Sequence, residues 1–413
     1  MTTKTTYTPA IRFPDFLNDG EWEVKRLEEI SDYENGIAHE NDIDSDGDFI
    51  IVNSKFISSD GQIKKRTNVP RCLAQKDDVL MVLSDLPNGR ALAKCFYVAE
   101  NNLYTVNQRI CKFHPKNVNS KLLYYLVNRN EYFLSFDDGV KQTNLKKGDV
   151  LNCPLIIPKS IEEQDFIATC LTSLDELLSA TNEKLEQLKA YKKSLMQKLF
   201  PAKGKKLPEL RFKEFEKDGQ WEEKELGAAA KVKSGYAFRS NTYTPTGRYT
   251  IITISNVKNG YLDLTSNNFV EHLPEDIQPH QILKKGDILI SMTGNVGRVC
   301  KVCCDNCLLN QRVGLVDVYS SDVDRNYIYT ILTSDWFEKS MIESGQGAAQ
   351  ANIGNKDIEG YRFFCPPTLS EQRKIADSVT SIDEMINQYT NKVTLLELYK
   401  KGLMQQMFPN SKQ

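Results

Sequence analysis

The chain has 413 residues, of which 40% are hydrophobic and 26% charged, a composition typical of a folded chain of two or three domains. It has no run of about 18 apolar residues, and its first residues lack the apolar core and cleavage site of a signal peptide, so we expect neither a membrane helix nor secretion. Ten scattered cysteines favour a reducing, cytoplasmic location. The net charge of −2 gives no overall basic signature of a nucleic-acid partner, although a neutral total leaves room for local basic surfaces.

A first globule is predicted over residues 1–159. After a polar start it opens on Phe13-Pro14 and Trp22, and short apolar or β-branched runs predict strands at 49–52 and 79–83. A short helix is predicted at 122–128. The globule is therefore expected to be of α+β type and rich in strands.

A long helix is predicted over residues 160–201. Ser160 and Glu163 fit a capping box at its start, and Pro201 ends it because proline has no N–H to donate. Apolar residues recur at alternating spacings of four and three, the heptad pattern of a helix that packs along a partner. The predicted seam consists of Leu171, Leu174, Leu178, Leu185 and Leu188.

The same plan repeats in the second half of the chain. After a predicted linker at 203–206, a second globule over 202–367 opens on Trp221, with strands at 249–252 and 287–290 and a short helix at 327–332. A second long helix over 368–413 repeats the first at a constant offset of 208 (368 − 160 and 409 − 201). Its seam consists of Val379, Ile382, Ile386, Val393 and Leu396.

Lysines occupy the same seam position in both helices, at Lys192 and Lys400. A lysine in an apolar seam can fix the register or orientation of a helix pair at a cost in stability. It can equally extend its ammonium group out to solvent near a frayed helix end. The sequence leaves both interpretations open.

Short segments also recur inside the two globules, while the residues between them differ. Asn107-Gln108-Arg109 corresponds to Asn310-Gln311-Arg312. Gln142-Thr143-Asn144 corresponds to Gln350-Ala351-Asn352. The two globules are therefore expected to share a frame and to differ in their loops.

Three motifs suggest catalysis or metal binding, and each departs from its pattern. Pro14-Asp15 with Glu23 and Lys25 formally matches a nuclease motif, but seven intervening residues leave little room for the two strands of a metal site. Pro366-Pro367 lacks the neighbours of an adenine methyltransferase motif, and no Gly-rich nucleotide loop accompanies it.

A cysteine cluster is the third motif. Two abutting Cys-x-x-Cys units supply the four thiolates that a structural zinc needs, but without the usual intervening loop. We favour free thiols in a hairpin over zinc. The residues concerned are Cys300, Cys303, Cys304 and Cys307.

Taken together, the duplication and the order of the motifs resemble the specificity subunit of a type I restriction-modification enzyme. Each half has an opening Trp, a Lys-x-Asp-Ile/Val-Leu strand, an Asn-Gln-Arg segment, and a helix with Glu-Gln at its start and Tyr-Lys-Lys-x-Leu-Met-Gln near its end. The resemblance covers nearly the whole chain. It implies two target recognition domains, 1–159 and 202–367, separated by spacer helices 160–201 and 368–413 that pair as an antiparallel coiled coil.

The resemblance also implies function and partners. Each globule would recognise one half of a bipartite target in double-stranded DNA, while the helices set the spacing and bind two methyltransferase subunits, with restriction and motor subunits joining through them. The chain itself would be non-catalytic and bind no cofactor. S-adenosylmethionine, ATP and Mg²⁺ would belong to the partner subunits, and the biological role would be restriction, DNA methylation and antiviral defence.

Candidate DNA-binding residues are long polar donors in predicted loops. Arginine pairs with guanine and asparagine or glutamine with adenine in the major groove, while lysine and arginine also bind phosphates. In the first globule they are Lys64, Lys65, Arg66, Arg71, Arg90, Lys141, Gln142 and Asn144. In the second they are Arg239, Asn256, Asn295, Arg298, Gln346, Gln350 and Asn352.

The shared Asn-Gln-Arg segment is set apart from these candidates. An identical residue in an identical frame cannot distinguish two different half-sites, so we assign the segment to scaffold or phosphate contacts. The competing hypothesis for the whole chain is a protein-interaction scaffold, in which a coiled coil joins two strand-rich modules without DNA specificity.

Overall fold

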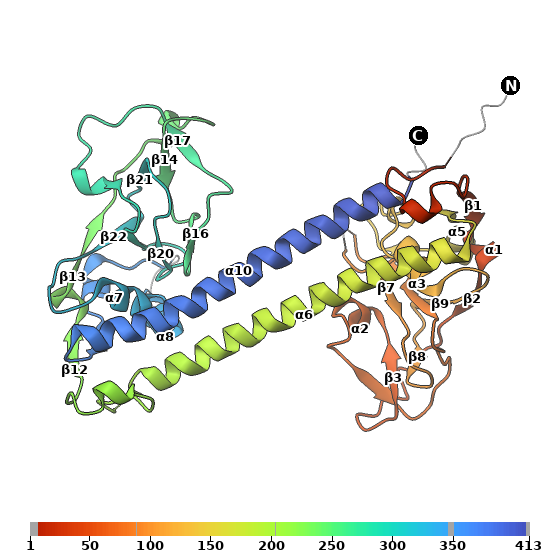
Figure 1. Ribbon diagram of the computed structural model, residues 1–413, viewed down its shortest axis with the longest axis horizontal. Coiled ribbons are helices and arrows are strands. Elements are labelled where there is room, and N and C mark those ends of the chain that lie inside the picture. Colours follow the sequence, from red (N-terminus) through yellow and green to blue (C-terminus); the bar gives the residue numbers. More distant parts are fainter. Residues whose placement is uncertain (1–6, 88, 203, 346–350, 410–413) are drawn as a thin grey trace. The chain divides into compact units, whose positions relative to one another are not determined.

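The computed structural model describes residues 7–87, 89–202, 204–345 and 351–409. The chain divides into two compact units: unit 1 consists of Met1–Asn182 and Asn391–Gln413, and unit 2 of Glu183–Thr390. Two long helices, α6 (Ile161–Leu199) and α10 (Leu369–Met407), each contribute one part to either unit (Figure 1). Each unit therefore combines a globule with one segment of each helix.

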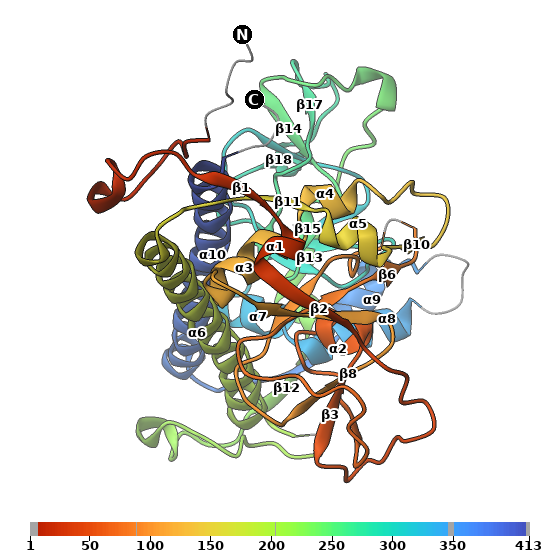
Figure 2. The ribbon, with the colours of Figure 1, turned by 90° about the vertical axis from the view of Figure 1, so that its right-hand side faces the viewer.

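Unit 1 contains a four-stranded antiparallel sheet of order β2-β9-β5-β7, a three-stranded sheet β4-β3-β8 and the pairs β1-β11 and β6-β10. Figure 2 views the molecule from the side of this unit, with β2, β3 and β8 among the labelled strands. The strands are β1 Glu23–Arg26, β2 Ser31–Asn35, β3 Phe49–Val52, β4 Lys65–Thr67, β5 Val79–Val82, β6 Ser84–Asp85, β7 Cys95–Tyr97, β8 Tyr104–Val106, β9 Ile110–Pro115, β10 Thr143–Asn144 and β11 Pro154–Ile157. The short helices are η1 Pro14–Phe16, α1 Leu27–Ile30, α2 Ser54–Ser58, α3 Ser120–Val127, α4 Glu131–Leu134 and α5 Lys147–Leu151.

Unit 2 repeats this plan with the sheets β13-β22-β19-β20 and β17-β14-β21-β18 and the pairs β12-β23 and β15-β16. The strands are β12 Glu222–Glu225, β13 Ala230–Ser234, β14 Tyr249–Ile252, β15 Val257–Lys258, β16 Tyr261–Leu262, β17 Asn268–Val270, β18 Ile282–Leu283, β19 Ile288–Ser291, β20 Val299–Lys301, β21 Cys307–Leu309, β22 Val313–Val318 and β23 Arg362–Cys365. The short helices are η2 Lys213–Phe215, η3 Leu226–Ala228, η4 Ser240–Thr242, η5 Pro279–Gln281, α7 Arg325–Leu332, α8 Asp335–Ser344 and α9 Asn355–Glu359.

The central strands β5 and β19 are buried on both faces, which is why their sequences are continuous apolar runs. Alternate side chains of a strand point to opposite faces. Val79 and Met81 therefore join one apolar cluster while Leu80 joins another. In unit 2, Ile288 and Leu289 divide in the same way. Each central strand thus contributes to two apolar clusters, one on either face of the strand.

The start of each long helix is fastened to its globule by a buried Glu-Gln pair. Ser160 caps α6 by accepting the N–H of Glu163 at 3.2 Å, which is half of the predicted capping box. The other half is wrong, because the Glu163 carboxylate instead accepts hydrogen bonds from Nε and one terminal nitrogen of Arg12, each at 2.7 Å, and from the indole N–H of Trp22 at 3.2 Å. Gln164 accepts the backbone N–H of Asn119, the cap of α3.

Unit 2 builds the same fastening at the start of α10. Glu371 accepts two hydrogen bonds from Arg211, at 2.7 and 2.8 Å, and one from the Trp221 indole at 3.2 Å. Gln372 accepts the N–H of Asp324, the cap of α7. The repeated Trp and the repeated Glu-Gln are therefore parts of one contact.

The helix ends also meet the opening tryptophans. The ring of Phe408, at the end of α10, lies 6.3 Å from that of Trp22, and Phe200, at the end of α6, lies 6.3 Å from Trp221. Both contacts are edge-on, the arrangement that aromatic pairs prefer. In each unit one helix copy therefore begins, and the other ends, at the same tryptophan, so the two helices run antiparallel.

Burial follows the predicted seam on both helices. The fully buried seam residues are Leu171, Leu174, Leu185, Leu188, Val379 and Ile382. Leu178, Ile386, Val393 and Leu396 are half-buried. The seam lysines form ion pairs between the helices, with Lys192 Nζ 2.6 Å from Asp383 in unit 2 and Lys400 bound to Asp175 in unit 1.

The cysteine cluster does not lie in a hairpin, contrary to our prediction. Cys300 on β20 and Cys307 on β21 belong to different sheets, and both are buried in an apolar cluster with Cys304. Burial raises the pKa of the Cys300 thiol to about 12, which keeps it protonated at neutral pH. No three or more His, Cys, Asp or Glu side chains are arranged to hold a metal ion among the residues that the structure describes. Nor is any described helix long and apolar enough to cross a membrane.

Candidate nucleic-acid interface

The Asn-Gln-Arg segment is the turn that connects the two sheets of each unit. In unit 1 it links β8 to β9, and the Asn107 N–H donates to the Val52 carbonyl at 3.0 Å. In unit 2 it links β21 to β22, and the Asn310 N–H donates to the Ile252 carbonyl at 3.1 Å. The turn therefore holds the same position in both units.

A glycine packs flat against this turn in each unit. A Cβ on Gly36 would lie 2.2 Å from the Asn107 carbonyl oxygen, and one on Gly235 would lie 2.2 Å from the Asn310 carbonyl oxygen. Such distances are far below any real Cβ contact, so both positions need glycine. The repeated asparagine and the glycine thus form a rigid backbone junction.

Beside this turn, the residue that directly follows the central strand forms backbone hydrogen bonds with two other segments of the chain, so that three segments meet. In unit 1 the Leu83 N–H donates to the Arg109 carbonyl at 2.9 Å, and the Leu83 carbonyl accepts the Leu145 N–H at 2.8 Å. In unit 2 the Met292 N–H donates to the Arg312 carbonyl at 3.0 Å, and the Met292 carbonyl accepts the Ile353 N–H at 2.9 Å. This arrangement, which we call the three-segment junction, is common to both units.

In unit 1 four of the predicted DNA-binding residues surround the junction. Asn144 lies on β10 opposite Ser84 of β6, and Lys141 and Gln142 directly precede β10. Arg90 lies in the loop after β6, which Asp85 closes by accepting the N–H groups of Leu86, Ala91 and Leu92. Arg90, Lys141, Gln142 and Asn144 are all exposed.

Unit 2 places different side chains around the same junction. Asn352 bridges to Thr293, whose hydroxyl donates to the Asn352 side-chain oxygen at 3.0 Å. Asn295 is exposed in the loop that follows, and Arg298 is half-buried with its guanidinium 3.8 Å from Glu338. Gln346 and Gln350 lie outside the described residues.

The remaining candidates of unit 1 lie on or beside β4, in the other sheet. Lys64 and Lys65 are exposed there, while Arg66 donates to the Gly47 carbonyl at 2.9 Å. Arg71 is paired with Asp42 at 2.7 Å. In unit 2 Arg239 is exposed next to η4. These residues are not part of the three-segment junction.

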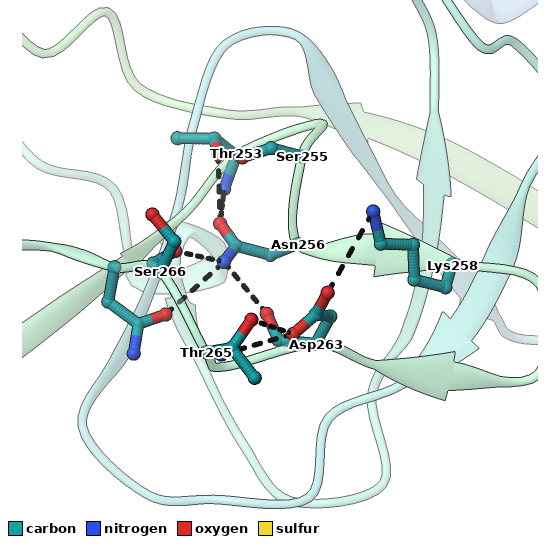
Figure 3. A network of polar contacts seen from close by, with 8 residues as sticks. Thr253, Ser255, Asn256, Lys258, Asp263, Thr265 and Ser266 are labelled. Atoms are coloured by element: carbon teal, nitrogen blue, oxygen red, sulfur yellow. Dashed lines mark hydrogen bonds and ion pairs between the residues drawn. The ribbon is translucent and has the colours of Figure 1, made fainter. Parts of the chain in front are cut away.

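Asn256 is buried, which corrects its place among the candidates for base contact. Its side-chain oxygen accepts from the backbone and hydroxyl of Thr253, and its amide nitrogen donates to the carbonyls of Asp263 and Ser266 and to the Asn267 side chain (Figure 3). With 2% of its surface exposed, its polar atoms are occupied inside the protein. Asn256 therefore holds a loop in shape and is not displayed to a ligand.

Sequence reasoning missed two contributors to these sites. Asp85 was not singled out, although it closes the Arg90 loop, and a single aspartate after a strand gives no distinguishing signal. The glutamate of each Glu-Gln pair was interpreted only as part of a helix cap, and the pair itself only as a motif of the family resemblance. Their exact repetition beside repeated tryptophans was the available sign of a tertiary contact.

Comparison with known proteins agrees with this duplicated plan. The family described as "Type I restriction modification DNA specificity domain" matches residues 19–190 and 218–397. The specificity subunit of the MjaVIII type I restriction enzyme of Methanocaldococcus jannaschii is 24% identical over 404 residues, 93% of this chain and 91% of that protein. The EcoAI specificity subunit of Escherichia coli is 29% identical over 216 residues, 50% of this chain and 35% of that one.

Among solved structures, the crystal structure of a type I restriction-modification S subunit from M. genitalium has a similar fold. Its TM-score is 0.71 with 17% sequence identity, and the match covers 98% of this chain and 100% of that one. The family match covers most of the chain and falls once on each globule with its helix. The chain therefore belongs to the family of type I restriction-modification DNA specificity subunits, with two target recognition domains.

Proposed function

We propose that each unit recognises one half of a bipartite DNA target with the side chains around its three-segment junction. The observation that carries this proposal is the junction itself, which has the same hydrogen bonds in both units but different surrounding side chains. Exposed Arg90 and Lys141 lie in the segments beside it in unit 1, and Asn295 and Arg298 lie in the loop beside it in unit 2. A shared frame with different polar side chains is what two independent half-sites require.

The two long helices bind two methyltransferase subunits, one to each unit. Exposed apolar side chains occupy equivalent positions on the helix copies: Leu177 and Met385 are 44% and 40% exposed, and Tyr191 and Tyr399 are 57% and 61% exposed. Unit 1 contains Leu177 and Tyr399, whereas unit 2 contains Met385 and Tyr191. Each unit thus offers one member of each pair, which suits two copies of the same partner.

The other activities of the complex reside on partner subunits. Type I specificity subunits are non-catalytic, so methylation with S-adenosylmethionine and cleavage with ATP and Mg²⁺ belong to the methyltransferase and to the restriction or motor subunits. In this arrangement the helices of the present chain also set the spacing between half-sites. The restriction subunits bind to the complex that this chain forms with its methyltransferase subunits.

The experiment is co-expression with a type I methyltransferase subunit followed by sequencing of methylated adenines. The expected result is one motif of two short half-sites separated by a spacer of fixed length. Replacing residues 13–158 by the corresponding domain of a relative should change one half-site and leave the other intact. A single continuous motif, or no methylation by a complex that forms, contradicts the proposal and favours a scaffold without DNA specificity.

A further inference from the structure

The Asn-Gln-Arg turn has a structural role through its backbone, and this role does not account for its arginine. Asn107 and Asn310 are fixed at their backbones and pack against glycines. Arg109 and Arg312 contribute only carbonyl groups to the junction. Their side chains are exposed, and neither makes a hydrogen bond or ion pair with any residue that the structure describes. The fold alone therefore gives no reason for an arginine at these two positions.

The two arginines start from equivalent backbone positions. In unit 1 the Arg109 carbonyl accepts from Leu83, whose own carbonyl accepts from Leu145, the neighbour of Asn144. In unit 2 the Arg312 carbonyl accepts from Met292, whose own carbonyl accepts from Ile353, the neighbour of Asn352. Each guanidinium group is thus attached to a rigid turn beside the residues that we assign to base recognition.

In unit 1, neighbouring carboxylates leave Arg109 free for a ligand. In unit 1 the nearby Glu40 carboxylate is bound by the Gln108 amide at 2.6 Å rather than by Arg109. The Asp85 carboxylate is occupied by three backbone N–H groups of its own loop. A permanently charged guanidinium without an internal partner is suited to an external anion.

The type of anion follows from the repetition. A side chain that is identical in both units, on identical frames, cannot distinguish two different base sequences. A backbone phosphate is present at every nucleotide and carries no sequence information. On the basis of the proposed function, we propose that Arg109 and Arg312 each bind a DNA phosphate, a sequence-independent contact that positions each domain on the duplex.

The test measures how DNA affinity depends on salt for the complex of this chain with its methyltransferase subunits. Each phosphate contact contributes about 0.9 to the slope of log K against log salt concentration. Arg109→Ala and Arg312→Ala should each lower the slope by about 0.9 and the double variant by about 1.8, on target and non-target DNA alike. The methylated motif should remain that of the wild type.

Charge-conserving variants separate a phosphate contact from a base contact. Arg109→Lys and Arg312→Lys should retain most of the slope, because a lysine also binds phosphate but lacks the planar fork that recognises guanine. Lys159→Ala, an exposed lysine beside the start of α6, removes the same charge and should leave the slope unchanged. Equal unfolding temperatures for all variants exclude a folding defect.

Three outcomes overturn the proposal. They are an unchanged slope in the arginine-to-alanine variants, a motif relaxed at one base, or an equal loss of slope in Lys159→Ala. Failure of the proposed function is distinguishable, because the wild-type complex would then show no bipartite motif. If the wild type methylates such a motif and the arginine variants bind DNA as it does, only the phosphate contact is refuted.

Discussion

Lys192 Nζ lies 2.6 Å from the Asp383 carboxylate, joining α6 to α10 within unit 2. The equivalent pair in unit 1 is Lys400 with Asp175. Both lysines and both aspartates are related by the repeat offset of 208 (400 − 192 and 383 − 175). Each helix copy therefore supplies the lysine of one pair and the aspartate of the other. Of the two interpretations open for the seam lysines, the ion pair favours a role in register and orientation.

Breaking one of these pairs should weaken the helix pairing modestly. Lys192 and Asp383 are partly exposed, so we expect a coupling free energy of about 0.5–1 kcal/mol from a double-mutant cycle with Lys192→Ala and Asp383→Ala. The measurement is chemical denaturation of the complex or, if it is stable, of the free chain. Lys193→Ala removes an adjacent exposed lysine and serves as the control. Zero coupling would mean that the pair does not contribute to register.

Removing the buried carboxylate at the start of a long helix should lower the free energy of unfolding far more than breaking a seam ion pair. Glu163→Gln leaves Arg12 without its carboxylate in a site where both side chains are almost fully buried. Loss of one member of a buried pair costs about 3–5 kcal/mol. Glu371→Gln should have a similar effect in unit 2, where Arg211 loses its partner.

The control for this prediction is Glu162→Gln, which alters the preceding, exposed carboxylate. Thermal unfolding followed by tryptophan fluorescence reports on the contact directly, because Trp22 donates to Glu163. A Glu163→Gln variant as stable as Glu162→Gln would refute a structural role for the buried carboxylate.

The periodic parts of the fold were predictable from the sequence, because their signals are local. The predicted starts of both long helices, at 160 and 368, lie one residue before α6 and α10, and the runs at 49–52 and 249–252 coincide with β3 and β14. The predicted end of the first helix lies two residues after Leu199, whereas the second helix ends at Met407 and does not extend to the predicted 413. The three-segment junction was not predictable, because Leu83, Arg109 and Leu145 are brought together only by sheet pairing. Asn256 was misjudged because an asparagine in a loop looks the same in sequence whether its amide faces solvent or is enclosed.

Asn256→Ala should destabilise unit 2 without altering the recognised sequence. The substitution removes an amide that satisfies several buried backbone groups, so we expect a loss of about 3 kcal/mol in unfolding free energy. Asn295→Ala, in the exposed loop beside the junction, should have a small effect on stability and change one half-site. Sequencing of methylated sites and a thermal scan of both variants test this division. A stable Asn256→Ala protein with an altered motif would reverse the two assignments.

Shortening both helices by one heptad tests whether they set the spacing of the half-sites. Deleting 181–187 together with 389–395 retains both ion pairs, which are 17 residues apart on each helix (192 − 175 and 400 − 383). Each helix then loses about 10 Å, or roughly three base pairs of duplex.

We expect this double deletion to give a motif with a shorter spacer or to lose binding, because DNA must otherwise twist or bend at a cost of a few kcal/mol. Methylome sequencing provides the readout. Deleting one heptad from α6 alone is the matched control and should disrupt the pairing. An unchanged spacer in a well-folded double-deletion variant would show that the helices do not determine it.

The fastening at each helix start also bears on how such chains diversify. Arg12 and Trp22 lie in the opening segment of the first globule, and Glu163 follows its end, so both ends of the globule meet at one buried contact. Arg211, Trp221 and Glu371 form the same contact for the second globule. An incoming domain with the same arginine and tryptophan in its opening segment would retain this contact with the resident helix. On the basis of the proposed function, recombination within the repeated helices would exchange an entire domain together with both of its ends, and so replace one half-site in a single event.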